Sequence, residues 1–121
     1  MPSQPNEEAA LLPDLSPQEL AAIDTYFDGD RAFYENFRAS CVLQFVEDIA
    51  LGDGACAAQD APVLRRTAHS LKSVLLTLGH DDHSAQAKAV EMAAQAGPWP
   101  QALAGWLDLR QRLVQSFGLS V

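Results

Sequence analysis

The stretch RRTAHSLKSVLLTLG, residues 65–79, has the apolar spacing of an amphipathic helix. Its apolar stripe recurs at alternating steps of four and three residues: Leu64, Ala68, Leu71, Leu75 and Leu78. At about 100° per residue, His69 lies roughly 160° from Leu71, so we expect it to point away from the core. Lys72 falls one turn later on the same face. An exposed imidazole beside an ammonium is a suitable acceptor for a phosphoryl group.

The composition describes one globular domain without a membrane span. The chain has 121 residues, 48% of them hydrophobic, and its uninterrupted apolar runs are short. The first residues contain neither a basic region nor a long apolar segment, so we expect no secretory signal and a cytoplasmic location. The net charge of −8 argues against binding to nucleic acid or to anionic membranes, since both require a basic surface.

The charge is unevenly distributed. No acidic residue occurs between Asp60 and Asp81, although a gap of this length also arises by chance. The exposed face of the helix is expected to carry two cations around the imidazole, then a small residue and an apolar one, which together suit a docking protein. Its members are Arg65, His69, Lys72, Ser73 and Leu76.

Capping residues and glycines predict four further helices. Residues 1–13 are expected to be a flexible tail and residues 14–121 a single domain. Ser16-Pro17-Gln18-Glu19 is a capping box that starts a short helix ending near Tyr26. The second helix is expected to begin after Asp30 and to end near Leu51, before Gly52-Asp53-Gly54.

Asp60 is the expected cap of the helix that carries His69, and Gly79 its expected end. Asp81 or Asp82 is the expected cap of the next helix, over residues 83–95, and a last helix is expected over residues 101–117. No strand pattern is present. The sequence therefore predicts an all-α fold, an antiparallel up-down-up-down four-helix bundle with a short additional N-terminal helix.

Other polar and aromatic residues are assigned structural roles. Phe33, Phe37 and Phe45 are expected in the core. The two cysteines follow no metal-binding spacing. His80 and His83 with two adjacent aspartates are a weak candidate for a metal site, but aspartates at a helix start are ordinary caps. We expect neither a metal nor a cofactor.

The spacing around His69 resembles the histidine-containing phosphotransfer (HPt) domain of two-component phosphorelays. The similarity lies in Ala68-His69-Ser70-Leu71-Lys72-Ser73, in Leu78-Gly79 and in Val90-Glu91. The family pattern is His-x-Leu-Lys-Gly, a glycine ten residues after the histidine, and a Leu-Glu pair in the following helix. Three positions depart from it: Ser73 replaces a glycine, Val90 replaces a leucine, and His80 and His83 replace a small and an apolar residue.

The resemblance implies that His69 is phosphorylated on Nε2 and that Lys72 stabilises the phosphate. Glu91 is a candidate for orienting the imidazole through Nδ1, with a solvated helix acid as the alternative. The implied partners are receiver domains of response regulators or hybrid histidine kinases, which would contact Arg65, Ser73 and Leu76. Family members of this size are usually monomers.

The chain has no glycine-rich nucleotide loop and no ATP lid, so we expect a phosphotransfer carrier rather than a kinase. The alternative is a helical docking or inhibitory module that binds a receiver or kinase without being phosphorylated.

Overall fold

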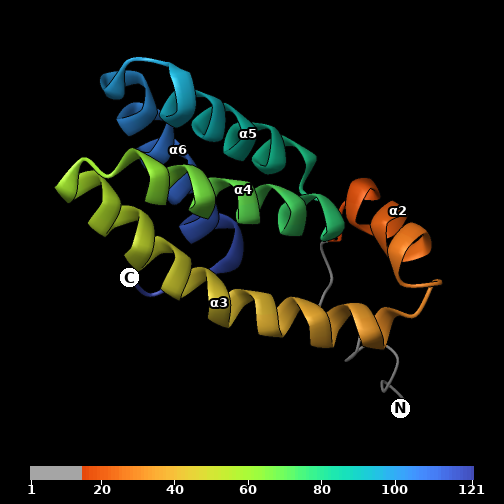
Figure 1. The fold of residues 1–121 in the computed structure, drawn as a ribbon. Helices are drawn as coiled ribbons and strands as arrows, with labels where there is room; N and C mark the ends of the chain where they lie inside the picture. Colours follow the sequence, from red (N-terminus) through yellow and green to blue (C-terminus); the bar gives the residue numbers. More distant parts are fainter. Residues whose placement is uncertain (1–14) are drawn as a thin grey trace, which may run out of the picture.

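The computed structural model describes residues 15–121, and in this range it contains five helices and no strand. The predicted tail, residues 1–13, lies outside the described residues. The helices are α2 (Pro17–Tyr26), α3 (Arg31–Ala58), α4 (Ala61–Thr77), α5 (Asp81–Ala96) and α6 (Trp99–Phe117). Figure 1 shows α3, α4 and α5 lying side by side, with α6 behind them. No helix in the described range is long and apolar enough to cross a membrane.

Of the four helix caps that the sequence predicted, three are confirmed and one is wrong. Ser16 and Glu19 form the complete capping box of α2, Asp30 accepts from the Phe33 amide, and Asp60 accepts from the Val63 amide. The exception is α5, for which the prediction that an aspartate is the cap is wrong. His80 occupies that position, and its side chain forms no capping hydrogen bond, while both aspartates lie in the first turn. There their charge still favours the helix N-terminus.

The prediction that the second helix ends before Gly52 is also wrong. Helix α3 continues through Gly52 and Gly54 to Ala58, and Gln59 ends it in the left-handed conformation. The reason is tertiary packing, because a Cβ on Gly52 would lie 2.0 Å from the Trp106 ring. Asp53 accepts from the Trp106 indole at 2.9 Å and from Arg110 at 3.0 Å. The glycine therefore permits close approach of α6 instead of breaking the helix.

The core lies between the facing sides of the helices. Helix α3 buries Tyr34, Cys41, Phe45 and Ile49, while α4 buries Leu64, Ala68, Leu71 and Leu75. Phe45 is buried as expected, and Phe37 packs against the core. Phe33 was expected in the core but is 55% exposed. It lies outside the row that faces α4, with its ring at the edge of Phe27.

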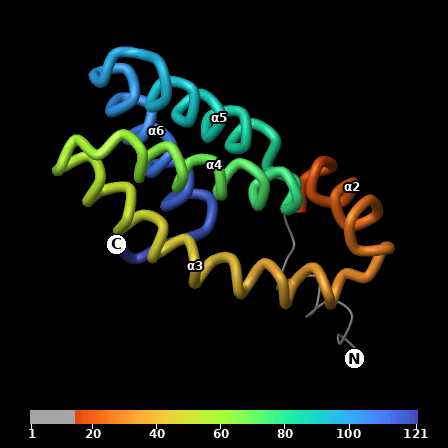
Figure 2. The backbone as a smooth tube through the Cα atoms, viewed as in Figure 1, coloured from red at the N-terminus to blue at the C-terminus, as the bar shows by residue number. Residues whose placement is uncertain are grey.

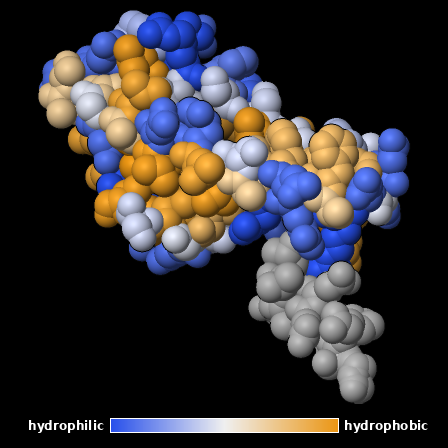
Figure 3. All heavy atoms as spheres, turned by 90° about the horizontal axis from the view of Figure 1, so that it is seen from below, coloured by the Kyte–Doolittle hydropathy of each residue, from blue (hydrophilic) through white to orange (hydrophobic). Residues whose placement is uncertain are grey.

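Helix α3 also has an outward side that carries apolar residues. Leu43, Val46 and Leu51 are exposed there. Viewed from below, the molecule shows hydrophobic residues gathered over this side (Figure 3).

Helix α2 crosses the end of the molecule where α3 begins and α4 ends, as the tube in Figure 2 shows. Gly79, which follows α4, has a φ of +87°, and a Cβ there would lie 2.7 Å from the backbone of Gln18 and Glu19. Tyr34 donates from its hydroxyl to the Leu78 carbonyl at 2.8 Å, which joins α3 to the same turn. This turn therefore fixes α2 close to the last residues of α4.

Candidate functional site

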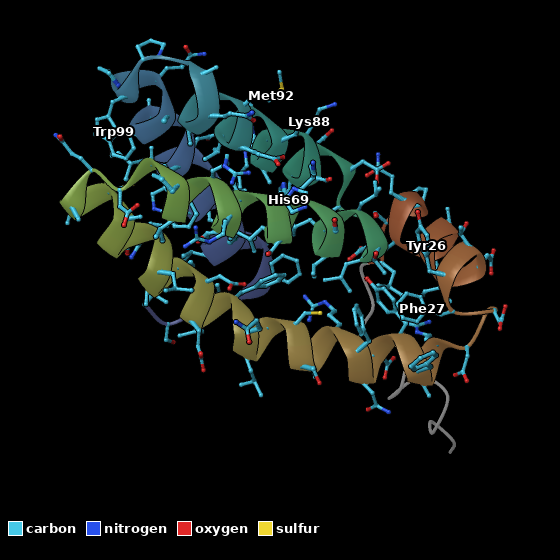
Figure 4. All side chains as sticks on the ribbon, viewed as in Figure 1. Tyr26, Phe27, His69, Lys88, Met92 and Trp99 are labelled. Atoms are coloured by element: carbon cyan, nitrogen blue, oxygen red, sulfur yellow. The ribbon has the colours of Figure 1, made fainter. Side chains whose placement is uncertain are left out.

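His69 is held on the surface by the register of α4. Ala68 and Leu71 on either side of it are fully buried, so the imidazole points to the opposite side. Its side chain is 60% exposed, as the helix pattern predicts. Figure 4 shows His69 on the side of α4 that faces α5. The ring is thus accessible to a second protein.

Helix α5 is fixed against α4 next to this histidine. The buried Ser84 donates its hydroxyl to the Lys72 carbonyl at 2.8 Å, a contact between the two helices. Ala87 and Glu91 follow Ser84 by about one and two turns, on the same side of α5. Ala87 is fully buried, and its small side chain lets the helices approach closely. This packing directs Glu91 toward His69.

Glu91 contacts both residues of α4 that were predicted to take part in the chemistry, His69 and Lys72. The Nδ1 atom of His69 lies 2.7 Å from Oε2 of Glu91, and the Lys72 ammonium donates to Oε1 at 2.8 Å. The Glu91 side chain is 14% exposed and that of Lys72 is 29% exposed, against 60% for the imidazole. The structure thus brings His69, Lys72 and Glu91 together, with only the imidazole standing well out in solvent.

The carboxylate determines which ring nitrogen of the neutral imidazole carries the proton. Hydrogen bonds, first from Lys72 and then from His69, hold the pKa of Glu91 below its ordinary value, so it is ionised at neutral pH. An ionised carboxylate only accepts hydrogen bonds, so Nδ1 of His69 must carry the proton. In the neutral ring, Nε2 then keeps its lone pair and faces away from the carboxylate. This is the arrangement that a nucleophilic imidazole requires.

The three residues predicted to contact a partner lie in different surroundings. Arg65 is partly exposed and lines a hollow beside His69, about 250 Å³ in volume, together with Arg66, Ser70 and Glu91. Ser73 is exposed one turn after His69, outside that hollow. Leu76 is exposed and lines a second hollow of about 220 Å³, on the side of α2.

The second hollow includes residues that the sequence did not single out. Tyr26 at the end of α2 is 51% exposed and lines it beside Ala22 and Thr25. Figure 4 shows Tyr26 on α2 at the far end of α4 from Trp99. The sequence signal that could have identified Tyr26 is an aromatic residue in the last turn of a short helix. Its position beside Leu76 depends on the contact of α2 with Gly79.

The imidazoles of His80 and His83 contact other side chains and do not form a metal site with them. Nε2 of His80 lies 3.0 Å from Oε2 of Glu19, and Nε2 of His83 lies 2.7 Å from the Ser116 hydroxyl. The centroids of the two rings lie 5.3 Å apart, and the ring planes are tilted by 32°. Across residues 15–121, no three His, Cys, Asp or Glu side chains are grouped so that they could hold a metal ion.

Comparison with known proteins found no match to a family model, to a curated protein or to a solved structure. The functional interpretation therefore depends on the residues and their geometry.

Proposed function

We propose that the chain is a phosphorelay intermediate of the histidine-containing phosphotransfer type. In this proposal, His69 accepts a phosphoryl group from a receiver-domain aspartate and passes it to another receiver domain. One observation supports it above all: an exposed imidazole whose Nδ1 is hydrogen-bonded to a carboxylate and whose Nε2 forms no hydrogen bond with any of residues 15–121.

The transfer is an exchange of one phosphorus bond for another. Nε2 of His69 attacks the phosphorus of the aspartyl phosphate, the new N–P bond forms, and the P–O bond to the donor carboxyl breaks with its electron pair on that oxygen. Nδ1 keeps its proton and its hydrogen bond to Glu91, which stabilises the positive charge that develops on the ring. The reverse sequence returns the phosphoryl group to a second aspartate.

Lys72 has two roles in this proposal. In the unphosphorylated protein its ammonium holds Glu91 in place. In the phosphorylated protein it lies on the same face as the phosphoryl group and stabilises the charge on its oxygens. Its ammonium is a compact charge whose three donors rotate freely, so it can turn from the carboxylate to the phosphoryl oxygens.

A receiver domain is proposed to dock across the end of α4 and α2. Leu76 and Tyr26 offer apolar and aromatic surface there, and Ser73 is small enough to admit a close backbone. Arg65, on the other side of His69, offers a positive charge to an acidic partner. The proposed scaffold is the antiparallel up-down-up-down bundle of α3–α6, with α2 as the short additional helix. We propose a monomeric, cytoplasmic carrier that needs no nucleotide.

Incubation with a panel of radiolabelled phosphorylated receiver domains tests this function. We expect at least one receiver to transfer its label, the label to be acid-labile and base-stable, and His69→Gln to abolish it. Lys88→Ala, a change at an exposed residue of α5 outside the hollow beside His69, is the control and should keep the label. Tight receiver binding without any transfer would favour the alternative, a docking module that is not phosphorylated.

A further inference from the structure

The residues that line the hollow beside His69 do not include Lys72. Arg65, Arg66 and Ser70 of α4 line it with His69, and Glu91 closes it from α5. A side chain on a helix leans toward the helix N-terminus and covers the preceding turn. The imidazole of His69 therefore leans toward the turn that carries the two arginines, while Lys72 lies in the following turn.

The cations on the two sides of His69 also differ in their partners. The Lys72 ammonium is bound to Oε1 of Glu91. Within residues 15–121, neither arginine forms an ion pair with a carboxylate. Glu91, the carboxylate of this hollow, already binds His69 and Lys72 through its two oxygens. Two arginines without a carboxylate partner thus line the hollow together with His69.

From this geometry we infer that the hollow is a phosphoryl-binding site, in which Arg65 and Arg66 bind the oxygens of the group carried on Nε2 of His69. The inference rests on the proposed function and extends it, since it assigns the anion-binding role chiefly to the arginines before the histidine. A volume of about 250 Å³ readily accommodates a phosphoryl group. A guanidinium presents several donors in a planar fork that matches two phosphate oxygens at once.

The site has a consequence that can be measured on the phosphorylated protein without any partner. Cations beside a phosphoryl group favour its more highly charged form and therefore lower the pKa of its last proton. If the arginines only stabilised α4, replacing them would not change the pKa of the phosphoryl group. The same contacts should accelerate phosphorylation by a small anionic donor, because they bind the incoming group.

The experiment uses phosphoramidate, which donates its phosphoryl group to Nε2 and releases ammonia, so no docking protein is needed. The pKa of the phosphoryl group on His69 is then measured by phosphorus NMR in the wild type and in Arg65→Ala, Arg66→Ala and the double variant. Lys88→Ala is the matched control, since Lys88 is an exposed cation on α5 outside the hollow. Figure 4 shows Lys88 projecting from α5.

We expect each arginine variant to raise the phosphoryl pKa above that of Lys88→Ala, and the double variant to raise it most and to slow phosphorylation about tenfold. A variant with lysine at both positions should fall between the double alanine variant and the wild type, because it keeps the charge and loses the fork. If the double alanine variant and Lys88→Ala have the same phosphoryl pKa, the site is not there. If the wild type forms no phosphohistidine at all, the proposed function itself fails with it.

Discussion

The Nδ1 atom of His69 and the Oε2 atom of Glu91 lie 2.7 Å apart, although the two residues belong to different helices. The contact is on the surface of the molecule, where an ion pair or hydrogen bond is weak unless its members are held in place. Here Lys72 binds the other oxygen of the carboxylate, and Ser84 joins α5 to the Lys72 carbonyl. The imidazole is therefore oriented by groups that are themselves fixed.

The tautomer of His69 should depend on Glu91. We expect Glu91→Ala to give a mixture of the two neutral tautomers, because the acceptor for the Nδ1 proton is lost, and to slow phosphoryl transfer at least tenfold. Nitrogen NMR of the ring reports the tautomer directly. Gln95→Ala, one turn later on the same helix and exposed, should leave both properties unchanged. An unaltered tautomer in Glu91→Ala would show that the carboxylate does not orient the ring.

The pKa of Glu91 should depend most on Lys72. Because the Lys72 hydrogen bond is the main cause of its lowered value, Lys72→Ala should raise the pKa of Glu91 toward the ordinary 4.5. The folded carboxyl binds fewer protons than the unfolded one, so its stabilising contribution is present above pH 4.5 and is lost as the pH falls through the lowered value. Carbon NMR of the carboxyl group measures the shift. A Glu91 pKa that is the same in Lys72→Ala and Lys88→Ala would contradict the assigned contact.

The two glycines of α3 should respond in opposite directions to alanine. Gly52→Ala places a Cβ 2.0 Å from the Trp106 ring and should destabilise the protein by about 1–3 kcal/mol. Gly54→Ala meets nothing within 4 Å and should stabilise it by about 0.5–1 kcal/mol, through the better helix propensity of alanine. Urea unfolding of the two variants measures both effects. Equal stabilities would mean that Gly52 is not needed for the packing of α6.

The stability of the fold should fall in mild acid because of His80 and His83. Burial lowers the pKa of both imidazoles below 6.5, and charges from α2, α3, α5 and α6 modify it less. For His80 the charged neighbours are Glu19, Arg38 and Asp81, and for His83 they are His80, Arg112, Asp82 and Asp108. The folded state thus binds fewer protons than the unfolded state, so stability is full above pH 6.5 and declines as the pH falls below it.

Urea unfolding between pH 7.5 and pH 5.5 checks this expectation. The decline should be smaller in the double variant His80→Gln, His83→Gln than in the wild type. Gln95→Ala, a change at an exposed residue that has no titratable group, is the control and should retain the wild-type decline. A double variant with an undiminished decline would assign the pH dependence to other groups.

Local patterns predicted the parts of the molecule that depend on local chemistry. Ser16, Asp30 and Asp60 were identified as caps because a side chain that accepts from an amide three residues later is a property of one short segment. The exposure of His69 followed from the helix period. Glu91 was placed near His69 through the resemblance to a known spacing, and the distance of 2.7 Å is in agreement with that placement.

Features that depend on contacts distant in sequence were missed. Gly52-Asp53-Gly54 has the composition of a helix end, but Trp106 packs against Gly52 and bonds to Asp53. The pairing of His80 with Glu19 joins residues 61 positions apart, so no local signal indicates it. For the same reason Arg65 was predicted only as a cation on the His69 face, while the hollow that it shares with Arg66 and His69 appeared only in three dimensions.

Mapping of the phosphorylated atom tests the proposed function most directly. The protein is incubated with a phosphorylated receiver domain, the modified residue is located by mass spectrometry at high pH, and the substituted nitrogen is assigned by NMR. We expect a single phosphoryl group on Nε2 of His69. Phosphate on Nδ1 or on another residue, or no transfer from any receiver tested, would contradict the role assigned to this histidine.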